Sequence, residues 1–271
     1  MSSIVRGEGA AVAVPEMVAR LREVMSGYSR PWSLCGGWAV DAWLGRVTRE
    51  HGDVDVSVFR SDCEAVFAHF AGWQLVAHGP GSEGNAALWD GRPLGTPSHL
   101  HGRPPDLITG PPPESGIMMP AEGWWLDVQI DERAVTGAES PGHGERRGHG
   151  TTGAESPGRE RSAGPESGPG RERSAGPASG PGRERSHAAE EWVLHASARI
   201  SLPLSEAVRE SPWGVPVAAP EVVLFFKSRD LRRRDRVDFA ALVPLLSARE
   251  RGWLRDAIAA VGHPWMGELK G

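Results

Sequence analysis

The chain has 271 residues, a formal net charge of -5 and a pI of about 6.1, which predicts one or two domains. Because this balance gives no general basic surface, duplex nucleic acid is not the expected partner. No run approaches the ~18 consecutive apolar residues of a membrane span, and the first ten residues lack the apolar core of a signal peptide. The two cysteines, Cys35 and Cys63, cannot form a disulfide framework. We therefore expect a cytoplasmic protein with no membrane partner.

The residues before position 80 are predicted to alternate helices with short strands. Helices are expected where apolar residues recur every three or four positions, and strands where apolar and polar residues alternate. Gly36 and Gly37 interrupt the first strand, and Gly45 ends the helix that follows. The predicted helices span residues 15–25, 38–44 and 63–70, and the predicted strands span residues 32–35, 53–59 and 73–77.

The next part of the chain is rich in Gly and Pro. Residues 79–120 are predicted to be mostly loop, with a short strand over residues 86–89. Residues 124–131 alternate again between apolar and polar types, which predicts a strand. Its polar face carries Asp127 and Asp131.

Residues 136–186 form a low-complexity segment. The sequence TGAESPG occurs at Thr136 and again at Thr152, and a unit of twelve residues then repeats with its arginines in register. The segment contains no Val, Ile, Leu, Phe or Trp, so it cannot bury enough apolar surface to offset the entropy of ordering. Repeats without a hydrophobic face also exclude a solenoid. We predict a disordered insertion, and the nearly balanced charge argues against a strong electrostatic tether.

The ordered chain resumes after the insertion with one strand and then helices. Because the insertion lies between two predicted strands, it is expected to be an expanded hairpin loop, whose closure entropy grows only slowly with length. The predicted strand spans residues 191–200, and the predicted helices span residues 220–228, 237–246 and 248–261. We expect four parts: a core over residues 1–135, the insertion over 136–186, a returning strand of the core within 187–213, and a C-terminal helical region over 214–271.

Two features before residue 60 point to chemistry on phosphates. Asp53 and Asp55 are two positions apart on a predicted strand, so both carboxylates point to the same face. Two adjacent carboxylates repel each other unless a divalent cation neutralises them, and hard oxygen ligands favour magnesium. The Gly36-Gly37 turn exposes backbone N–H groups at a helix N-terminus, where no Cβ blocks the approach of a phosphate.

A third carboxylate is expected nearby. Phosphoryl-type transfer often uses two metal ions roughly 3.5–4 Å apart, which three carboxylates can hold. Asp127, on the polar face of its own strand, is the first candidate, and Asp131 on the same face is the alternative. A Gly-Gly pair or a D-x-D strand is by itself most often an ordinary turn or a solvated face, whereas their combination predicts a nucleotide site.

Two runs of the sequence resemble a known family. The run GGWAVDAWLGRVTREHGDVDV, residues 36–56, resembles the signature of the aminoglycoside 2''-adenylyltransferase-like group of the polymerase-β-type nucleotidyltransferase superfamily, much of which lincosamide nucleotidyltransferases share. The superfamily pattern is a hydrophobic residue, Gly-Gly or Gly-Ser, a spacer, and Asp-hydrophobic-Asp. The spacer here, residues 38–52, is longer than the general pattern but similar to this group. The run GVPVAAPEVVLFFKSRDLRRRDRVDFAALVPLL, residues 214–246, also resembles the group, whereas the repeats have no counterpart.

The resemblance implies an α+β fold: a nucleotidyltransferase-type mixed sheet flanked by helices, followed by a C-terminal helical region. It also implies transfer of AMP from ATP to a hydroxyl group of a small molecule, such as an aminoglycoside-like antibiotic, with two Mg²⁺ ions. By position, Asp53, Asp55 and Asp127 would bind magnesium, and Asp127 would also act as general base. Gly36 and Gly37 would hold the triphosphate.

Three further residues are candidate nucleotide contacts. Lys227, on the predicted helix over residues 220–228, is expected to reach the triphosphate or to brace the site. Arg49 and His51 lie just before the aspartate pair and are candidate phosphate contacts. For His51, a hydrogen-bonded loop histidine without a role in binding is an equal alternative.

Several polar residues nearby have structural interpretations. Asp235 and Asp238 match an acidic pair of the family and are expected to pair with the surrounding arginines; Arg234 stands where many relatives have Lys. Asp41, one helical turn after Gly37, is expected to orient its helix.

Two pairs of ring-bearing residues have competing interpretations. Trp124 and Trp125 are expected to be core and rim residues, with stacking on a base or sugar as the alternative. His99 and His101 suggest zinc, but the sequence shows no further ligands around them, so no metal site is expected there.

Two alternative functions remain open from the sequence. One is a toxin-type nucleotidyltransferase that modifies tRNA or protein, and the other is a catalytically silent nucleotide-binding protein. The intact Asp53-Asp55 pair argues against the silent protein. Fold alone does not identify the acceptor.

Overall fold

The computed structural model describes residues 13–79, 87–95, 98–108, 125–136, 189–195, 199–230 and 232–267. The strands are β1 (Ser33–Leu34), β2 (Val54–Phe59), β3 (Gln74–His78), β4 (Ala87–Leu88), β5 (Ser98–Arg103), β6 (Leu126–Thr136), β7 (Ala189–His195), β8 (Ile200–Pro203), β9 (Val208–Glu210) and β10 (Pro216–Ala218). The α-helices are α1 (Glu16–Met25), α2 (Gly36–Leu44), α3 (Cys63–His69), α4 (Leu204–Ala207), α5 (Pro220–Lys227), α6 (Arg233–Leu242) and α7 (Ala248–Val261). Single 3-10 turns lie at Arg60–Asp62, Pro105–Leu107, Val243–Leu245 and Pro264–Gly267.

The described strands join in one mixed sheet. Its main path runs β4-β3-β5-β6-β2-β1-β10-β9, with β7 and β8 continuing from the far end of β6. The two central strands, β2 and β6, are parallel, and their register places Asp55 opposite Asp127. Strand β6 also pairs antiparallel with β5. The predicted mixed sheet is therefore confirmed.

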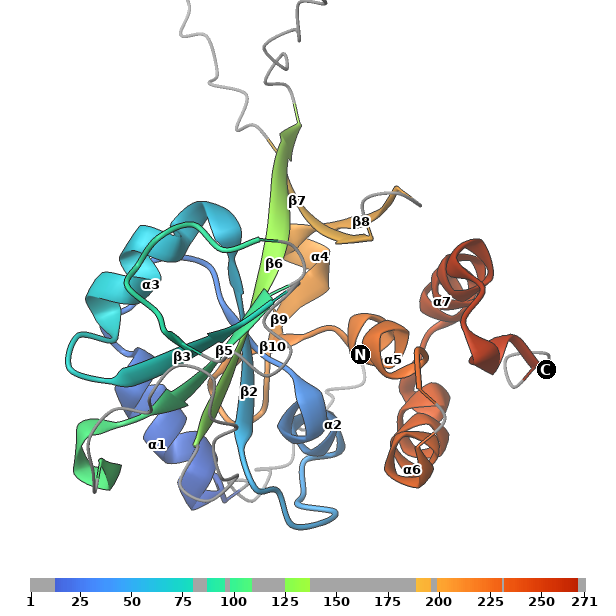
Figure 1. Ribbon diagram of the computed structural model, residues 1–271. Helices are drawn as coiled ribbons and strands as arrows, with labels where there is room; N and C mark the ends of the chain where they lie inside the picture. Colours follow the sequence, from blue (N-terminus) through green and yellow to red (C-terminus); the bar gives the residue numbers. More distant parts are fainter. Residues whose placement is uncertain are drawn as a thin grey trace, which may run out of the picture. The chain divides into compact units, whose positions relative to one another are not determined.

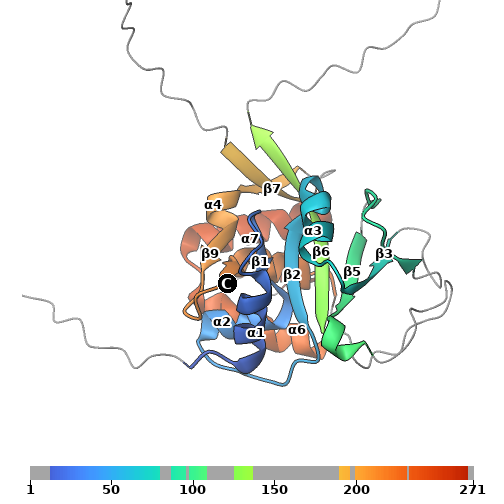
Figure 2. The same cartoon turned by 90° about the vertical axis from the view of Figure 1, so that its left-hand side faces the viewer.

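Helices cover both faces of the sheet, as predicted. Figures 1 and 2 show α1 and α3 on one face, and α2 with the C-terminal helices α5, α6 and α7 on the other. Helix α1 places its apolar stripe, including Val18 and Leu21, in the core. Helix α2 is buried on nearly all sides, since it lies between β2 and the helices α5 and α6. The Asp55 carboxylate lies against Gly36, the first residue of α2, so Asp55 is on the face of the sheet that α2 covers.

The C-terminal helical region is confirmed as well. Helix α5 buries a run of large apolar side chains, among them Leu224 and Phe225. Helix α7 begins with a capping box between Ser247 and Glu250 and ends at Gly262 in the left-handed conformation, so both of its ends have the local signals that define them. None of the described helices is long and apolar enough to cross a membrane.

The strands on either side of the low-complexity segment pair with each other. Strands β6 and β7 form an antiparallel ladder from Glu132 opposite Val193 to Thr136 opposite Ala189, which confirms the predicted hairpin. Thr136, placed by the sequence in the insertion, is the last residue of β6. The predicted disorder of residues 136–186 otherwise falls outside the described residues.

The structure corrects several predicted elements. The single strand expected over residues 191–200 is wrong, because β7 ends at His195 and Ile200 begins the antiparallel strand β8. The expected loop over residues 79–120 contains β5, a strand inside the sheet. The short elements α4, β9 and β10 were not predicted. Helix α6 begins at Arg233, ahead of the predicted residue 237, since its charged first turn has no apolar periodicity.

Candidate functional site

A cavity of about 470 Å³ opens between the central strands and the helices α2 and α5. This volume falls within the ~300–1,000 Å³ typical of small-molecule sites. The carboxylates that line it are Glu50, Asp53, Asp55, Asp127, Asp131 and Asp235, and the cations are Arg49, Lys227, Arg229, Arg232 and Arg234. Gly36, Gly37 and His51 line it as well. All the residues predicted for the site therefore meet in one cavity.

The sheet register brings the three predicted metal ligands together. Asp55 lies in β2 and Asp127 is its direct partner in the parallel strand β6, so their side chains share one face. Asp53 directly precedes β2, where the Trp38 indole donates a hydrogen bond to its backbone carbonyl over 3.0 Å. The Cys35 N–H donates to the Asp55 carbonyl over 2.9 Å, which ties β2 to the start of α2. Asp53, Asp55 and Asp127 thus converge on the cavity, as their strand positions predict.

The electrostatics of this group favour an added positive charge. Burial, followed by repulsion from Asp53, raises the pKa of Asp55 to about 6. Burial, followed by repulsion from Asp55 and Asp53, raises the pKa of Asp127 to about 8. Asp127 Oδ1 is buried and accepts no hydrogen bond from any described residue. A bound cation would offset the repulsion between the carboxylates and would coordinate the unpaired Asp127 oxygen.

Asp131, the alternative third ligand, has a different environment. Its carboxylate accepts a hydrogen bond from the Ser57 hydroxyl, although burial still raises its pKa to about 6. Both Asp127 and Asp131 line the cavity, but only Asp127 lies opposite Asp55 in the register. The geometry therefore favours Asp127 as the partner of the aspartate pair.

The two glycines start helix α2 instead of forming a separate turn before it. Gly36 has a φ of 61°, and a Cβ added there would overlap the carboxylate of Asp55. A Cβ on Gly37 would overlap the side chains of Arg49 and His51. The space that a Cβ would occupy at the two glycines is thus filled by side chains that line the cavity, namely those of Asp55, Arg49 and His51.

This packing makes Gly36→Ala more damaging than an ordinary glycine substitution. Gly45 is a matched control, because its φ is 67° and nothing lies within 4 Å of an added Cβ. We expect Gly45→Ala to lower the free energy of unfolding by roughly 1–2 kcal/mol through backbone strain. Gly36→Ala should add about 1–3 kcal/mol for the overlap with Asp55. Denaturant titration of the two variants measures the difference, and equal losses would contradict the close packing of Asp55 on Gly36.

His51 is held by a buried carboxylate. Its Nε2 lies 2.7 Å from Asp41 Oδ2, and its ring lies 4.4 Å from the Trp38 ring between centroids. Burial would raise the pKa of Asp41, but the hydrogen bonds from His51 and Thr48 hold it below its ordinary value. Asp41 was expected to orient its own helix. Through His51 and Thr48 it also holds the segment before β2.

Arg49 points toward the C-terminal helices. Its Nη2 lies 3.9 Å from Asp238 Oδ2, and its Nη1 donates to the Glu50 carbonyl over 3.1 Å. Because its side chain is partly exposed and lines the cavity, it remains a candidate phosphate contact.

Lys227 is buried between two acidic residues of α6. Its Nζ lies 3.2 Å from Asp235 Oδ1 and 2.8 Å from Asp238 Oδ2. The expected arginine partner is present for Asp235, since Arg232 Nε lies 2.5 Å from its Oδ2. The shared lysine was not predicted as their partner. This ion-pair cluster joins α5 to α6 at the wall of the cavity.

Sequence reasoning missed part of the cationic wall. Arg229 and Arg232 line the cavity together with Arg234, from the segment between α5 and the first turn of α6. The only signal was the run of arginines after Lys227, which also fits a solvated helix face.

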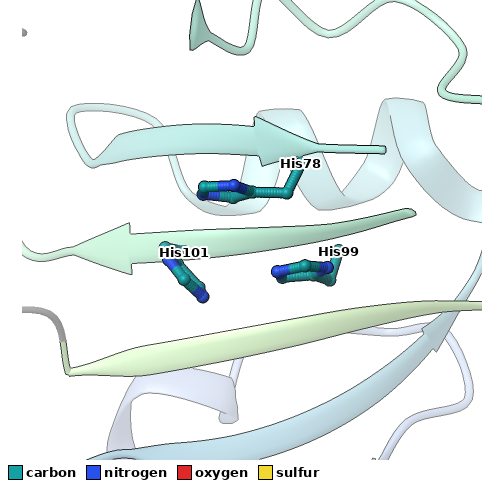
Figure 3. A group of neighbouring side chains, drawn as sticks. All are labelled: His78, His99 and His101. Atoms are coloured by element: carbon teal, nitrogen blue, oxygen red, sulfur yellow. The ribbon is translucent and has the colours of Figure 1, made fainter. Parts of the chain in front are cut away.

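The tryptophan pair and the histidine pair differ in how well the structure agrees with their predicted roles. Trp124 lies outside the described residues, whereas Trp125 is buried with the Arg20 guanidinium 4.8 Å from its ring, as expected for a core residue. The expectation that no further ligand lies near His99 and His101 is wrong. His78 of β3 lies beside them, and the three side chains form the group shown in Figure 3.

One family model matches part of the chain. Residues 17–75 match the family model described as Aminoglycoside-2''-adenylyltransferase, which confirms the resemblance over this part of the chain. At the level of that family, the match supports nucleotidyl transfer to antibiotics. The matched residues include Gly36, Gly37, Asp53 and Asp55, whereas Asp127 and Lys227 lie beyond them. No curated protein matches the chain.

Proposed function

We propose that this protein is a magnesium-dependent nucleotidyltransferase that moves AMP from ATP to a hydroxyl group of an aminoglycoside-like small molecule. The observation that carries the proposal is the convergence of Asp53, Asp55 and Asp127 on a cavity that cationic side chains also line. The family match over residues 17–75, which include Asp53 and Asp55, supports the same chemistry.

The donor set fits magnesium. All three groups offer hard oxygen ligands, and the buried Asp127 Oδ1 has no partner among the described residues. Asp53, Asp55 and Asp127 would hold two ions between them. When bound, such ions neutralise the charge that develops on the reacting phosphate and polarise its oxygens. The protein's own contribution is to position the triphosphate and the acceptor.

The proposed reaction forms one bond, breaks one bond and transfers one proton. In the proposed reaction the acceptor hydroxyl oxygen forms a bond to the α-phosphorus of ATP. The bond from that phosphorus to the bridging oxygen breaks, and pyrophosphate leaves with the electron pair. Asp127 accepts the hydroxyl proton, because it faces the aspartate pair across the parallel register.

The cationic wall would bind the departing phosphates. Arg229, Arg232 and Arg234 line the cavity and present guanidinium groups suited to phosphate oxygens. The backbone N–H groups at the start of α2, at Gly36 and Gly37, offer a second anion site. Lys227 would act through its ion pairs with Asp235 and Asp238, by holding α6 and the arginines near it in place.

The acceptor side is expected to suit a cation. Glu50 and Asp131 line the cavity in addition to the three proposed metal ligands. Carboxylates beyond those that magnesium needs would attract the ammonium groups of an aminoglycoside.

The direct test is a transfer assay with a panel of acceptors. The protein would be incubated with Mg²⁺, labelled ATP or GTP, and aminoglycosides, lincosamides, bulk tRNA or a protein mixture. We expect a labelled adduct on at least one aminoglycoside, abolished by EDTA and restored by Mg²⁺. Label on tRNA or protein alone would favour the toxin-type alternative. Nucleotide binding without an adduct on any acceptor would contradict enzymatic transfer.

Residues 137–186 should be dispensable for this activity. We expect a chain in which a short Gly-Ser turn joins Thr136 to His187 to fold and to transfer nucleotide at a near-native rate. The reason is that β6 and β7 pair up to Thr136 and Ala189, and a shorter loop costs less closure entropy. Circular dichroism and thermal unfolding check the fold before the rate is compared. Loss of activity in a folded deletion variant would instead assign the segment to the acceptor site.

A further inference from the structure

Three histidines gather on the sheet beside the carboxylate cavity. His78 lies in β3 directly opposite His99 in β5, and His101 follows two residues later on the same face (Figure 3). The ring centroids are separated by 4.9 Å for His78 and His99, 4.4 Å for His78 and His101, and 5.0 Å for His99 and His101. Three imidazoles from two paired strands thus face one another.

The ligand atoms are close enough to hold a single ion. One nitrogen from each ring lies within 4.8 Å of the other two. Zinc binds imidazole nitrogen at about 2.0–2.1 Å, so two nitrogens in a tetrahedral site lie about 3.3 Å apart. Rotations of the half-buried rings that move these nitrogens by about 1 Å would close the group on an ion. The backbone register already fixes the three Cβ positions.

We propose that His78, His99 and His101 form a binding site for one Zn²⁺ ion, separate from the magnesium site. Imidazole nitrogen favours zinc and similar transition metals, whereas magnesium favours oxygen, so the two sites select different ions. Three protein ligands leave a fourth position for water or another ligand. His101 also contacts the carboxylate group, because its Nε2 lies 3.8 Å from Asp127 Oδ2. An ion on the three histidines would therefore lie next to the third carboxylate.

The test measures zinc binding without nucleotide or acceptor. Protein without a polyhistidine tag, stripped with EDTA and held in excess Mg²⁺, would be titrated with Zn²⁺ by calorimetry and with Co²⁺ by visible absorption. We expect one Zn²⁺ per chain, and Co²⁺ absorption bands typical of nitrogen ligands in a low-coordinate site. His99→Gln and His101→Gln should each weaken binding by more than the 10- to 100-fold seen when outer-shell partners are lost.

Matched variants separate the histidine site from zinc binding elsewhere on the chain. His69→Gln removes a histidine whose Nε2 lies 2.9 Å from the Val24 carbonyl, outside the cluster, and should bind zinc like the wild type. Asp55→Asn should also bind zinc normally, because Asp55 belongs to the proposed transferase site and not to the histidine cluster. The zinc titration therefore tests the histidine site whether or not the protein transfers nucleotides. Circular dichroism and thermal unfolding confirm that each variant is folded. Unchanged zinc binding in both cluster variants, a sulfur-to-cobalt band from Cys35 or Cys63, or no zinc binding by the wild type would overturn the proposal.

Discussion

Replacement of Asp55 by Asn should abolish nucleotidyl transfer while leaving the protein folded. The amide keeps the shape of the side chain but removes the charge that would hold magnesium between β2 and β6. Charge stabilisation by a metal is worth several kcal/mol, and each 1.36 kcal/mol is a factor of ten in rate, so kcat/KM should fall by about 10³-fold or more. Asp53→Asn and Asp127→Asn should lower kcat/KM by factors of the same order. Steady-state kinetics at saturating Mg²⁺ measures these losses.

The stability of Asp55→Asn provides a second readout. The pKa of Asp55 in the folded protein is about 6, above the ordinary value of this carboxyl. The ionised group therefore destabilises the fold at pH values above 6, and removing its charge relieves that cost. Without magnesium at pH 8, we expect the free energy of unfolding of the variant to equal or exceed that of the wild type. A variant that kept most of the wild-type turnover would contradict the metal mechanism.

Asp131→Asn is the control within the same cavity. Its carboxylate accepts a hydrogen bond from Ser57 and does not lie opposite Asp55. We expect a much smaller loss of activity than for Asp127→Asn. The reverse order would make Asp131 the third metal ligand.

Lys227→Met should destabilise the fold strongly. The substitution leaves Asp235 and Asp238, both buried, without their shared cation. Removing one partner of a buried ion pair typically costs about 3–5 kcal/mol when the remaining charge is uncompensated. Arg232 still pairs with Asp235, so the loss comes mainly from Asp238, whose other cation, Arg49, lies 3.9 Å away. The free energy of unfolding from denaturant titration at pH 7 should fall by this amount.

Two further variants test whether the lost stability of Lys227→Met comes from unpaired buried charge. Combining Lys227→Met with Asp235→Asn and Asp238→Asn should recover much of the stability, since no buried charge is then left alone. Arg255→Ala, which removes an exposed ion pair with Asp256 at 3.2 Å, should change stability by less than about 1 kcal/mol. A loss for Lys227→Met no larger than that for Arg255→Ala would contradict the structural role of the lysine.

The parts of the site that the sequence predicted are those with strong local signals. The alternation around Asp55 and Asp127 indicates strands, and the period of two fixes which side chains share a face. Gly36 and Gly37 mark the point where β1 gives way to α2. The pairing of β2 with β6 then places these residues together, in agreement with the prediction.

The missed parts depend on tertiary pairing. Strand β5 buries Ser98, Leu100 and Gly102 on one face, and only Leu100 gives an apolar signal. The contact of His78 with the other two histidines follows from the β3–β5 register, which the sequence does not show.

The partners of Lys227 were missed for a similar reason. They lie on α6, and it is the packing of α5 against α6 that brings them to the lysine. Local periodicity predicts each helix but not which charged side chains meet between them.

Nucleotidyl transfer by this protein is tested most directly by following the label of ATP through the reaction. Two parallel reactions would contain wild-type protein, Mg²⁺ and an acceptor that forms an adduct, with label on the α-phosphate of ATP in one and on the γ-phosphate in the other. Nucleotidyl transfer predicts that the α-label moves to the acceptor and that the γ-label leaves in pyrophosphate, with one pyrophosphate released per adduct. Recovery of the γ-label on the acceptor, or of pyrophosphate without any labelled adduct, would contradict nucleotidyl transfer.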